Sequence, residues 1–525
     1  MLERPFKLGL FCLACSRLLL LISFAACGAT EEQIEADAEE TSAEVSTPPA
    51  ADPPVSALEC SDGFADCDGD RDNGCEVDLS TDRAHCGGCG RVCNWTCEEG
   101  VCNDPVQLSL GVFGSCAALG SGHAACWGLN YNGQIGDGSG GSVEAESLPT
   151  DANTSVFPPG DITPALARRP TYVRTSASTR LQGVTSVARG LHHACALTDD
   201  GEVYCWGANY NGQLGDGTTL PRGFAGLVRA PSEGFFAGPA LSDVVHISSG
   251  WYHSCAVVRS GRVYCWGRNL NGRLGNGVVE FEIVSTPVPM VGIGASTPML
   301  TEGVSVSGGV DATCVERTLG IVCAGRDSRG ARGDGDGLGP ASARPTRVRS
   351  VGDYAEWTQP TLQIQSLAQS GCALLQDGFV ACWGAAPFGS GHENIRAAPE
   401  RVLDPTGRDV LNNITQISGV DSHMCALDGE GFAYCWGWNG YGQLGSVSVL
   451  PDSSDVETTL PVALLNPSTA MPQGGIVEIS AGGRHTCTRM QDGRVLCWGQ
   501  NSYGELGNGE TGEAAYGVEV LPPLD

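Results

Sequence analysis

The chain has 525 residues, which is enough for more than one domain and for a large buried core. It carries 60 Asp and Glu residues against 30 Lys and Arg residues, a formal net charge of −30. A surface of that sign repels nucleic-acid phosphates and anionic lipid headgroups, so we expect neither nucleic-acid nor membrane-surface binding.

Residues 1–26 have the pattern of an export signal. Basic residues precede an apolar run over residues 18–26, which is too short to span a bilayer. The sequence FAAC at 24–27 resembles the cleavage site of bacterial lipoproteins, and this resemblance implies that Cys27 receives the lipid. Gly28 then favours an outer-membrane lipoprotein facing the periplasm or the cell surface. Because Phe24 replaces the usual leucine, ordinary cleavage and full secretion is the alternative.

Residues 27–59 are predicted to form a disordered tether. Nine acidic residues and no basic one lie within 31–59, together with four prolines. Charge repulsion and proline stiffness keep such a segment extended.

Residues 60–104 form a small cysteine-rich module. Eight cysteines in so short a segment predict four disulfides, because the segment is too small for a hydrophobic core of its own. Their pairing stays open at this point. The spacing of Cys86, Cys89 and Cys93 also resembles a zinc knuckle, an alternative that an oxidising compartment disfavours. The module is similar to a cysteine-rich unit attached to many myxobacterial surface proteins.

Alternating carboxylates inside the module suggest a calcium site. Oxygen ligands on a glycine-bearing loop are what Ca²⁺ requires, and the candidates are Asp66, Asp68, Asp70 and Asp72. Glu76 comes too early to serve as the closing glutamate of a hand-type loop. A merely solvated acidic loop is the alternative; no other cofactor is expected.

Residues 105–525 contain seven repeats. A clear copy reads GLHHACALTDDGEVYCWGANYNGQLGDG, from Gly190 to Gly217, and the first cysteines of the copies lie 79, 60, 59, 58, 53 and 62 residues apart. A period near 50–60 residues with glycine-rich punctuation predicts propeller blades. Each copy has one cysteine pair that is expected to form a disulfide: Cys116 with Cys126, Cys195 with Cys205, Cys255 with Cys265, Cys314 with Cys323, Cys372 with Cys382, Cys425 with Cys435, and Cys487 with Cys497.

The cysteine spacing predicts a stapled hairpin in each repeat. In six repeats the cysteines are ten residues apart, with a glycine one residue past their midpoint. In the second repeat a three-residue loop ending at Gly201 places Cys195 directly opposite Cys205, within disulfide reach. Apolar residues occupy both faces of this hairpin, which requires neighbours on both sides. The sequence therefore predicts an all-β chain, a seven-bladed propeller after a small disulfide-rich module.

The repeat pattern, with its G-x-x-H, W-G-x-N and G-Q-L-G elements, resembles the regulator of chromosome condensation repeat, a propeller family. The resemblance covers residues 105–525, and the paired cysteines match its secreted bacterial branch. It implies the fold, whereas the nuclear activities of the family, including exchange on a small GTPase, are not expected of an exported acidic chain.

Several residues that depart from the repeat pattern, or recur within it, could have a functional or a structural role. The fourth repeat lacks the tryptophan and carries Arg332 in place of a buried leucine, so it is either degenerate or modified for binding. The sequence Arg332-Gly333-Asp334 spells a cell-adhesion tripeptide, which we attribute to chance. Repeated histidines, at His193, His253, His423 and His485, and the repeated tryptophans are interpreted as structural.

We expect a non-catalytic binding scaffold for an unidentified protein ligand, because the sequence contains no recognisable catalytic motif. Long connections, at 139–181, 218–241, 278–301, 338–361 and 446–474, are the expected recognition loops. The alternative is a carbohydrate-binding or polysaccharide-active surface protein that uses the propeller channel.

Overall fold

The structure is a computed structural model that describes residues 60–523, except 71–72, 141–164, 232–237, 295–297, 319, 328, 337–338, 352–356, 358, 386–388, 393 and 447–456. The predicted export signal, Cys27 and the predicted tether lie outside the described residues. Within the described part, no helix has the length and hydropathy needed to cross a membrane.

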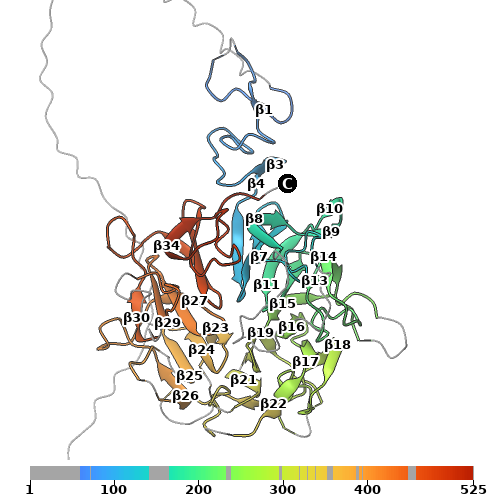
Figure 1. The fold of residues 1–525 in the computed structure, drawn as a ribbon, viewed down its shortest axis with the longest axis vertical. Helices are drawn as coiled ribbons and strands as arrows, with labels where there is room; N and C mark the ends of the chain where they lie inside the picture. Colours follow the sequence, from blue (N-terminus) through green and yellow to red (C-terminus); the bar gives the residue numbers. More distant parts are fainter. Residues whose placement is uncertain are drawn as a thin grey trace, which may run out of the picture. The chain divides into compact units, whose positions relative to one another are not determined.

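Seven four-stranded antiparallel sheets follow one another over the described residues, each made of four consecutive strands. Figure 1 shows them in sequence order around a common centre, with the last blade beside the first. Blade 7 joins blade 1 through side-chain and backbone contacts only, since no strand is exchanged between them. The predicted seven-bladed, all-β propeller is confirmed.

The first three blades have the following strands. Blade 1 contains β5 (Pro105–Leu110), β6 (Gly114–Leu119), β7 (Ala124–Leu129) and β8 (Leu166–Tyr172). Blade 2 contains β11 (Val184–Arg189), β12 (His193–Thr198), β13 (Val203–Gly207) and β14 (Arg222–Leu227). Blade 3 contains β15 (Val244–Ser249), β16 (His253–Val258), β17 (Val263–Arg268) and β18 (Ile283–Pro289), with the short 3₁₀ turn η2 (Leu270–Gly272).

The remaining blades repeat the same order. Blade 4 contains β19 (Gly303–Gly308), β20 (Ala312–Arg317), β21 (Gly320–Gly325) and β22 (Ser342–Arg347). Blade 5 contains β23 (Thr361–Ser366), β24 (Ser370–Leu375), β25 (Val380–Gly384) and β26 (Arg396–Arg401). Blade 6 contains β27 (Ile414–Gly419), β28 (His423–Asp428), β29 (Ala433–Trp438) and β30 (Glu457–Ala463). Blade 7 contains β31 (Ile476–Ala481), β32 (His485–Met490), β33 (Val495–Gly499) and β34 (Ala514–Glu519).

The stapled hairpin is the second and third strand of each blade. In blade 2, Cys195 pairs in register with Cys205, and Gly201 closes the loop with a φ of 79°. Blade 4 keeps this register although its cysteines are nine residues apart, because its hairpin loop has two residues instead of three.

All seven predicted repeat disulfides are formed, each with a Cα–Cα distance of 4.1 Å. From blade 1 to blade 7 they join Cys116 to Cys126, Cys195 to Cys205, Cys255 to Cys265, Cys314 to Cys323, Cys372 to Cys382, Cys425 to Cys435, and Cys487 to Cys497. Each disulfide therefore links two neighbouring strands of one blade, and none of these seven joins one blade to another.

Each hairpin buries both of its faces, as predicted. Cys195, Leu197 and Val203 pack in one cluster with Trp266 of blade 3, whereas Ala196 and Trp206 pack in another cluster with residues of blade 1. In the six blades that have it, the tryptophan after the second cysteine packs in this way: Trp127, Trp206 and Trp266, for example, fill the space between their own blade and the preceding one. These inter-blade layers form the core of the propeller.

The meander gives the propeller two chemically distinct faces. Connections from the first to the second strand, and from the third to the fourth, lie at one edge of every blade; we call this the turn face. The disulfide hairpin loops and the connections between blades lie at the opposite edge. The cysteine-rich module contacts that second edge, which we call the module face.

Four short strands form two two-stranded ladders in the module. These strands are β1 (Phe64–Ala65), β2 (Val77–Asp78), β3 (Cys97–Glu98) and β4 (Val101–Cys102). A further small ladder, β9 (Arg174–Ser176) with β10 (Thr179–Arg180), follows blade 1.

Candidate binding surfaces of the propeller

The first strands of the blades line a central channel of about 740 Å³. Polar side chains from these strands accept hydrogen bonds from the backbone of the next blade. The bonds run from Val187 N to Gln107 Oε1 (2.8 Å), Ile417 N to Gln363 Oε1 (2.8 Å), Ile479 N to Gln416 Oε1 (2.9 Å) and Leu108 N to Glu478 Oε1 (2.7 Å). The polar lining is therefore used to join neighbouring blades.

The channel lining contains two carboxyl groups among the described residues, Glu316 on blade 4 and Glu478 on blade 7. Glu478 accepts a second bond from Arg489 Nε at 2.9 Å, and burial raises its pKa. Glu316 accepts bonds from Ser305 Oγ (2.8 Å) and Thr361 Oγ1 (3.1 Å). Because the two carboxyls lie on non-adjacent blades and each has protein partners, they do not resemble the paired acids of a glycosidase.

A histidine joins blades at four of the seven blade interfaces. His193 Nε2 lies 2.8 Å from Ser254 Oγ, which donates to the Gln213 carbonyl at 3.0 Å. Trp266 Nε1 donates to the same carbonyl at 2.9 Å. Equivalent histidine–hydroxyl pairs are His253 with Thr313, His423 with Thr486, and His485 with Ser115, each at 2.8 Å.

These histidines are fully enclosed and bind protein hydroxyls. Burial lowers the pKa of His193 and His485 to about 3 and of His423 to about 4, and it holds the pKa of His253 well below its ordinary value. They are neutral at physiological pH, and their placement matches the structural interpretation given to the repeated histidines and tryptophans.

The interface between blades 1 and 2 uses a different device. Gly114 stands where four other blades have histidine, and Ala194 stands where the partner of that histidine has its hydroxyl. Arg189 fills the vacated space: a Cβ on Gly114 would lie 2.7 Å from Arg189 Nη2, and Nη1 donates to the Gln134 carbonyl at 2.6 Å. Sequence reasoning missed Arg189, although the paired loss of histidine and hydroxyl was a usable signal.

The fourth blade contains a buried ion triad on the turn face. Arg332 Nη2 lies 3.2 Å from Asp327 Oδ2 and 3.0 Å from Asp334 Oδ2, and all three side chains are buried. Asp327 replaces the asparagine of other repeats, so the exchange of leucine for arginine is matched by a new carboxylate. The triad also buries both charged ends of the Arg-Gly-Asp tripeptide, which leaves them unavailable to a receptor in this conformation.

Aromatic side chains and arginines gather at the turn face. In blade 3, Arg268 lies over the rings of Tyr252 (5.3 Å to the centroid) and Phe281 (5.6 Å). Across blades 6 and 7, Arg484 lies over Trp438 (5.9 Å) and Tyr441 (5.5 Å). All these residues are partly or fully exposed.

Smaller aromatic contacts extend the turn face across blades 1, 2 and 7. Phe113 stacks on His192 with a centroid distance of 5.6 Å and meets Tyr503 edge-on at 5.6 Å. Trp251 contacts Tyr252 edge-on at 6.2 Å. Because such rings are typical anchors of protein interfaces, the turn face has the composition of a binding surface.

Two acidic groups lie beneath this surface near Arg484. Burial raises the pKa of Glu505 to about 7 and that of Asp421 to about 6, while the positive charge of Arg484 acts in the opposite direction on both. Glu505 Oε2 accepts from Tyr503 N at 2.7 Å, and its Oε1 atom is buried with no hydrogen-bond partner.

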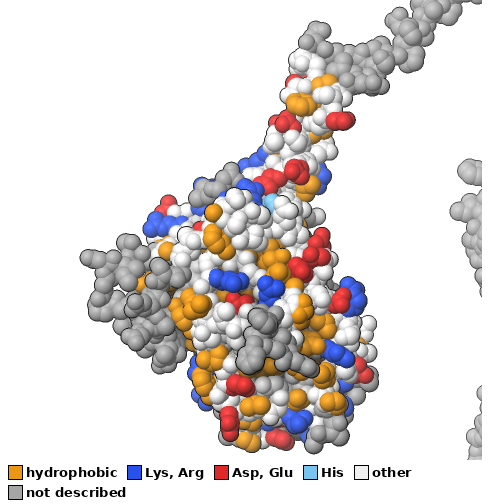
Figure 2. All heavy atoms as spheres, turned by 90° about the vertical axis from the view of Figure 1, so that its right-hand side faces the viewer, with side chains coloured by type: hydrophobic (Ala, Val, Ile, Leu, Met, Phe, Trp, Pro, Cys, Tyr) orange, Lys and Arg blue, Asp and Glu red, His pale blue; other side chains and the backbone are white. Residues whose placement is uncertain are grey.

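On the side of the molecule shown in Figure 2, hydrophobic, basic and acidic side chains are interspersed, and no comparable cluster stands out.

The prediction that the long connections are recognition loops needs one correction. Each connection contains the outer strand of its blade, namely β8, β14, β18, β22 or β30. These strands are mostly half-buried and each contains glycine or proline, so their sequences lack the alternation that marks a strand.

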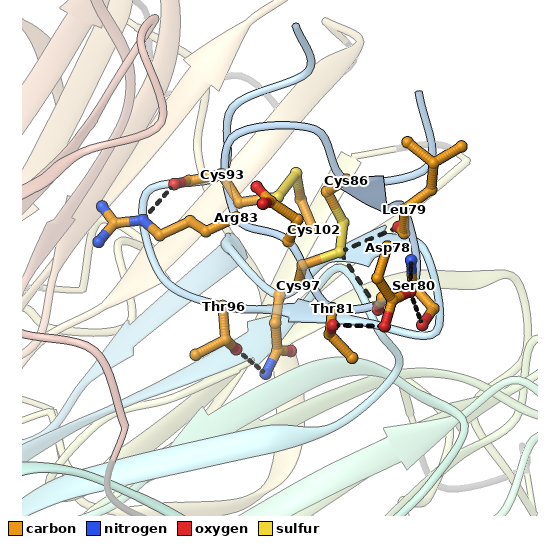
Figure 3. The surroundings of a disulfide bond; sticks show 12 residues. Asp78, Leu79, Ser80, Thr81, Arg83, Cys86, Cys93, Thr96, Cys97 and Cys102 are labelled. Carbon is orange, nitrogen blue, oxygen red and sulfur yellow. Dashed lines mark hydrogen bonds between the residues drawn. A yellow bond between two sulfur atoms is a disulfide. The ribbon is translucent and has the colours of Figure 1, made fainter. Parts of the chain in front are cut away.

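Four disulfides hold the module together, and the structure settles the pairing that the sequence left open: Cys60 with Cys75, Cys67 with Cys89, Cys86 with Cys97, and Cys93 with Cys102. A zinc site would need the free thiolates of these cysteines, which are instead bonded to one another in the disulfides. Figure 3 shows the region around Cys86 and Cys97, where Arg83 Nε donates to the Cys93 carbonyl at 2.6 Å and Cys97 Sγ lies 3.4 Å from the Ser80 carbonyl oxygen.

The candidate calcium residues are only partly brought together. Carboxylate oxygens of Asp66, Asp68 and Glu76 lie within 4.8 Å of one another, while Asp72 falls outside the described residues. Glu76 therefore joins the group although its spacing excluded it from a hand-type loop. Asp68 already accepts from Asp70 N (2.8 Å) and Asn73 Nδ2 (3.0 Å). Calcium binding stays a prediction, which calorimetric titration of the protein with CaCl₂ tests.

The module is joined to both ends of the ring of blades. Trp95, only 3% exposed, packs in the cluster shared by blades 1 and 7, beside Leu119, Val495 and Val520. Asn94 Nδ2 donates to the Asp492 carbonyl in the hairpin loop of blade 7 at 2.5 Å.

Polar contacts hold the module to blade 1. Glu98 accepts from Tyr172 Oη at 2.8 Å and pairs with Arg180 at 3.0 Å. The module therefore covers the seam where the ring closes, a role that its sequence did not reveal.

Comparisons with known proteins agree with this architecture. Two models of the regulator of chromosome condensation (RCC1) repeat match the chain, one at residues 184–213, 244–273, 414–443 and 476–505, the other at 200–257, 260–315 and 430–488. Blades 1 and 5 lie outside these matches, yet they have the same four strands.

Relatives cover most of the propeller. The ultraviolet-B receptor UVR8 of Arabidopsis thaliana is 28% identical over 419 residues, which are 77% of this chain and 79% of the receptor. The mitochondrial RCC1 domain-containing protein RUG3 of the same plant is 27% identical over 388 residues, 73% of this chain and 78% of that protein.

Solved structures show the same fold at lower identity. Human WBSCR16 matches with a TM-score of 0.58 and 21% identity, over 76% of this chain and 93% of that structure. Yeast RCC1 (Prp20), solved bound to Kap60, matches with a TM-score of 0.54 and 19% identity, over 80% of this chain and 85% of that structure.

Proposed function

The propeller is built from regulator of chromosome condensation repeats, and from that premise we propose that this protein is a non-catalytic scaffold of the cell envelope that binds a protein partner through its turn face. The observation that carries the proposal is the grouping of partly exposed aromatic rings and arginines at the turn face, opposite the face that the module partly covers. Large rigid rings bury much area at low entropic cost, which makes them effective anchors in protein interfaces.

Structures of relatives support a binding role of this general kind. One solved relative is yeast RCC1 bound to Kap60, and another bears a title that describes its binding to Gsp1p and histones. These partners belong to those proteins. An exported acidic chain does not meet them, so the partner proposed here is an envelope or extracellular protein.

Anchoring through lipid at Cys27 is the second part of the proposal. The lipoprotein-like sequence at 24–27 supports it, together with the position of the module on the face opposite the turn face. A chain that enters the propeller through the module leaves the turn face free to meet a partner. Metabolic labelling with a radioactive fatty acid tests this part: Cys27→Ser should abolish labelling, and labelling of both forms, or of neither, contradicts it.

Cross-linking in native envelopes tests the binding proposal. Full-length protein carrying a photoreactive residue at position 252 on the turn face should capture one stoichiometric protein. The same residue at position 262, in the hairpin loop of blade 3 on the module face, is the matched control. Trp438→Ala together with Trp251→Ala should remove capture without changing the melting temperature by more than a few degrees.

Two results would contradict the proposal. Equal capture from both positions would remove the distinction between the faces. Release of the bound material by free sugars would favour the carbohydrate-binding alternative.

A further inference from the structure

The two arginine–aromatic clusters of the turn face have no carboxylate partners of their own. Among the described residues, no Asp or Glu lies within ion-pair distance of Arg268 or Arg484, although other arginines of the same face are paired. Arg273 and Arg326, for example, both contact Asp311, at 2.6 and 3.3 Å.

This arrangement is unusual for a chain with a net charge of −30, in which acidic residues outnumber basic ones two to one. On a surface with this excess of acidic residues, an arginine is expected to have a carboxylate within ion-pair distance. Here the guanidinium groups lie over aromatic rings instead, at 5.3 Å from the Tyr252 centroid and 5.5 Å from the Tyr441 centroid.

A neighbouring ring orients each guanidinium group, and Arg484 Nη1 also donates to Tyr441 Oη at 3.4 Å, so the remaining N–H groups are the ones that a ligand can use. A fixed planar fork matches the two oxygens of a carboxylate, which is why arginine is the preferred residue for bidentate recognition. Flanking rings exclude water and strengthen such a pair. Asp421 and Glu505 interact electrostatically with Arg484, but neither forms an ion pair with it among the described residues.

We propose that the turn face recognises an acidic protein segment, whose carboxylates pair with Arg268 on blade 3 and Arg484 on blade 7 while its apolar side chains contact the neighbouring rings. This inference rests on the proposed function of the turn face and names the chemistry of its partner. Charge complementarity selects the occupant: a second copy of this chain presents the same arginines, whereas a partner bearing Asp and Glu neutralises them.

Fluorescence anisotropy with short peptides tests the inference on the full-length protein. The probes are a fluorescein-labelled peptide of alternating Glu and Leu, and matched peptides in which Glu is replaced by Gln or by Lys. The acidic peptide should bind at least tenfold more tightly than the Gln peptide, the Lys peptide should bind least, and added salt should weaken only the acidic complex.

Paired variants place the binding on the turn face. Arg268→Gln and Arg484→Gln should each weaken binding of the acidic peptide at least tenfold, because each removes a charge-assisted hydrogen-bonded pair. Arg262→Gln is the matched control: it changes the same charge at the opposite end of the same strand, in the exposed hairpin loop. Thermal melting of each variant shows whether it is folded.

The outcomes separate this inference from the proposed function. Equal binding of the three peptides, or equal loss in the Arg262→Gln control, overturns the acidic-segment inference. If the variants lose the peptide but no envelope protein cross-links at position 252, the acidic chemistry stands and the cell-envelope partner is wrong. If cross-linking succeeds but the acidic peptide does not bind, only this inference fails. Concentration-dependent dimers that Arg484→Gln abolishes would show that a second copy is the occupant, which also overturns it.

Discussion

The two faces of the propeller are built from the same strands, yet they differ in what their side chains do. At the module face, Trp95 and Asn94 of the module bind blades 1 and 7, and charged groups such as Glu98 and Arg180 pair with each other. At the turn face, Arg268 and Arg484 stack on aromatic rings without carboxylate partners among the described residues. Ring closure is therefore supported at the module face, and the proposed recognition is assigned to the opposite, turn face.

The largest effect is expected where the module covers the seam between blades 7 and 1. Trp95→Ala removes a side chain that is 3% exposed and should lower the free energy of unfolding by about 3–5 kcal/mol. Trp438→Ala, on the turn face and partly exposed, should cost much less. Urea denaturation of the two variants measures the difference. Equal costs would show that the two faces do not differ in this way.

The ion triad of blade 4 tests whether buried charges at the turn face are stable only when all of their ion-pair partners are present. Arg332→Leu alone leaves Asp327 and Asp334 buried without their cation and should destabilise the protein by about 3 kcal/mol. The double variant Asp327→Asn, Arg332→Leu restores the residues that other blades use. It should recover most of the loss in thermal melting, and a double variant as unstable as the single one would contradict this account.

Acidification should weaken the interfaces between blades, first at the end of each interface that lies near the turn face. The pKa of His193 is lowered to about 3 in the folded chain, whereas an unfolded histidine has a pKa near 6.5. The unfolded state therefore binds more protons below pH 6.5, so the contribution to stability is complete above that pH and is lost as the pH falls. The loss per histidine is on the order of 3 kcal/mol by about pH 4.

Hydrogen exchange at pH 7 and pH 4 measures this effect. Amides near His193 and His485 should lose protection before those of the disulfide hairpin loops at the module face. The interface of blades 5 and 6, where Ser370 stands in place of the histidine, is an internal control and should change least. Uniform loss of protection over all seven interfaces would argue that the histidines are not responsible.

The smallest effect concerns the polar contact between module and blade 7. Asn94→Ala removes one hydrogen bond to the Asp492 carbonyl and should cost about 1 kcal/mol. Differential scanning calorimetry against Asn73→Ala, a module residue outside this contact, separates the seam from the module itself. A larger cost for Asn73→Ala would show that the contact with blade 7 is not what matters.

Local sequence signals predicted the blades well because the constraints are short-ranged. Gly201, just past the midpoint between Cys195 and Cys205, specifies the loop, the register and the disulfide at once, and the same pairing persists when the spacing shortens in blade 4. The outer strands were missed because strands such as β14 and β22 are half-buried and contain glycine or proline, so they are defined by pairing with the third strand rather than by their own pattern.

The sequence by itself determined the hairpin disulfides, because each follows from residues within about ten positions of one another, and it determined the number of blades and the all-β class, because the same local motif recurs seven times. Only the tertiary structure decided the pairing of the module disulfides, the covering of the 7–1 seam by Trp95, the substitution of Arg189 for a histidine pair and the gathering of Arg268 and Arg484 with aromatic rings on one face. These features join residues from separate blades or from distant segments. Their contacts depend on how the ring closes, which no local pattern specifies.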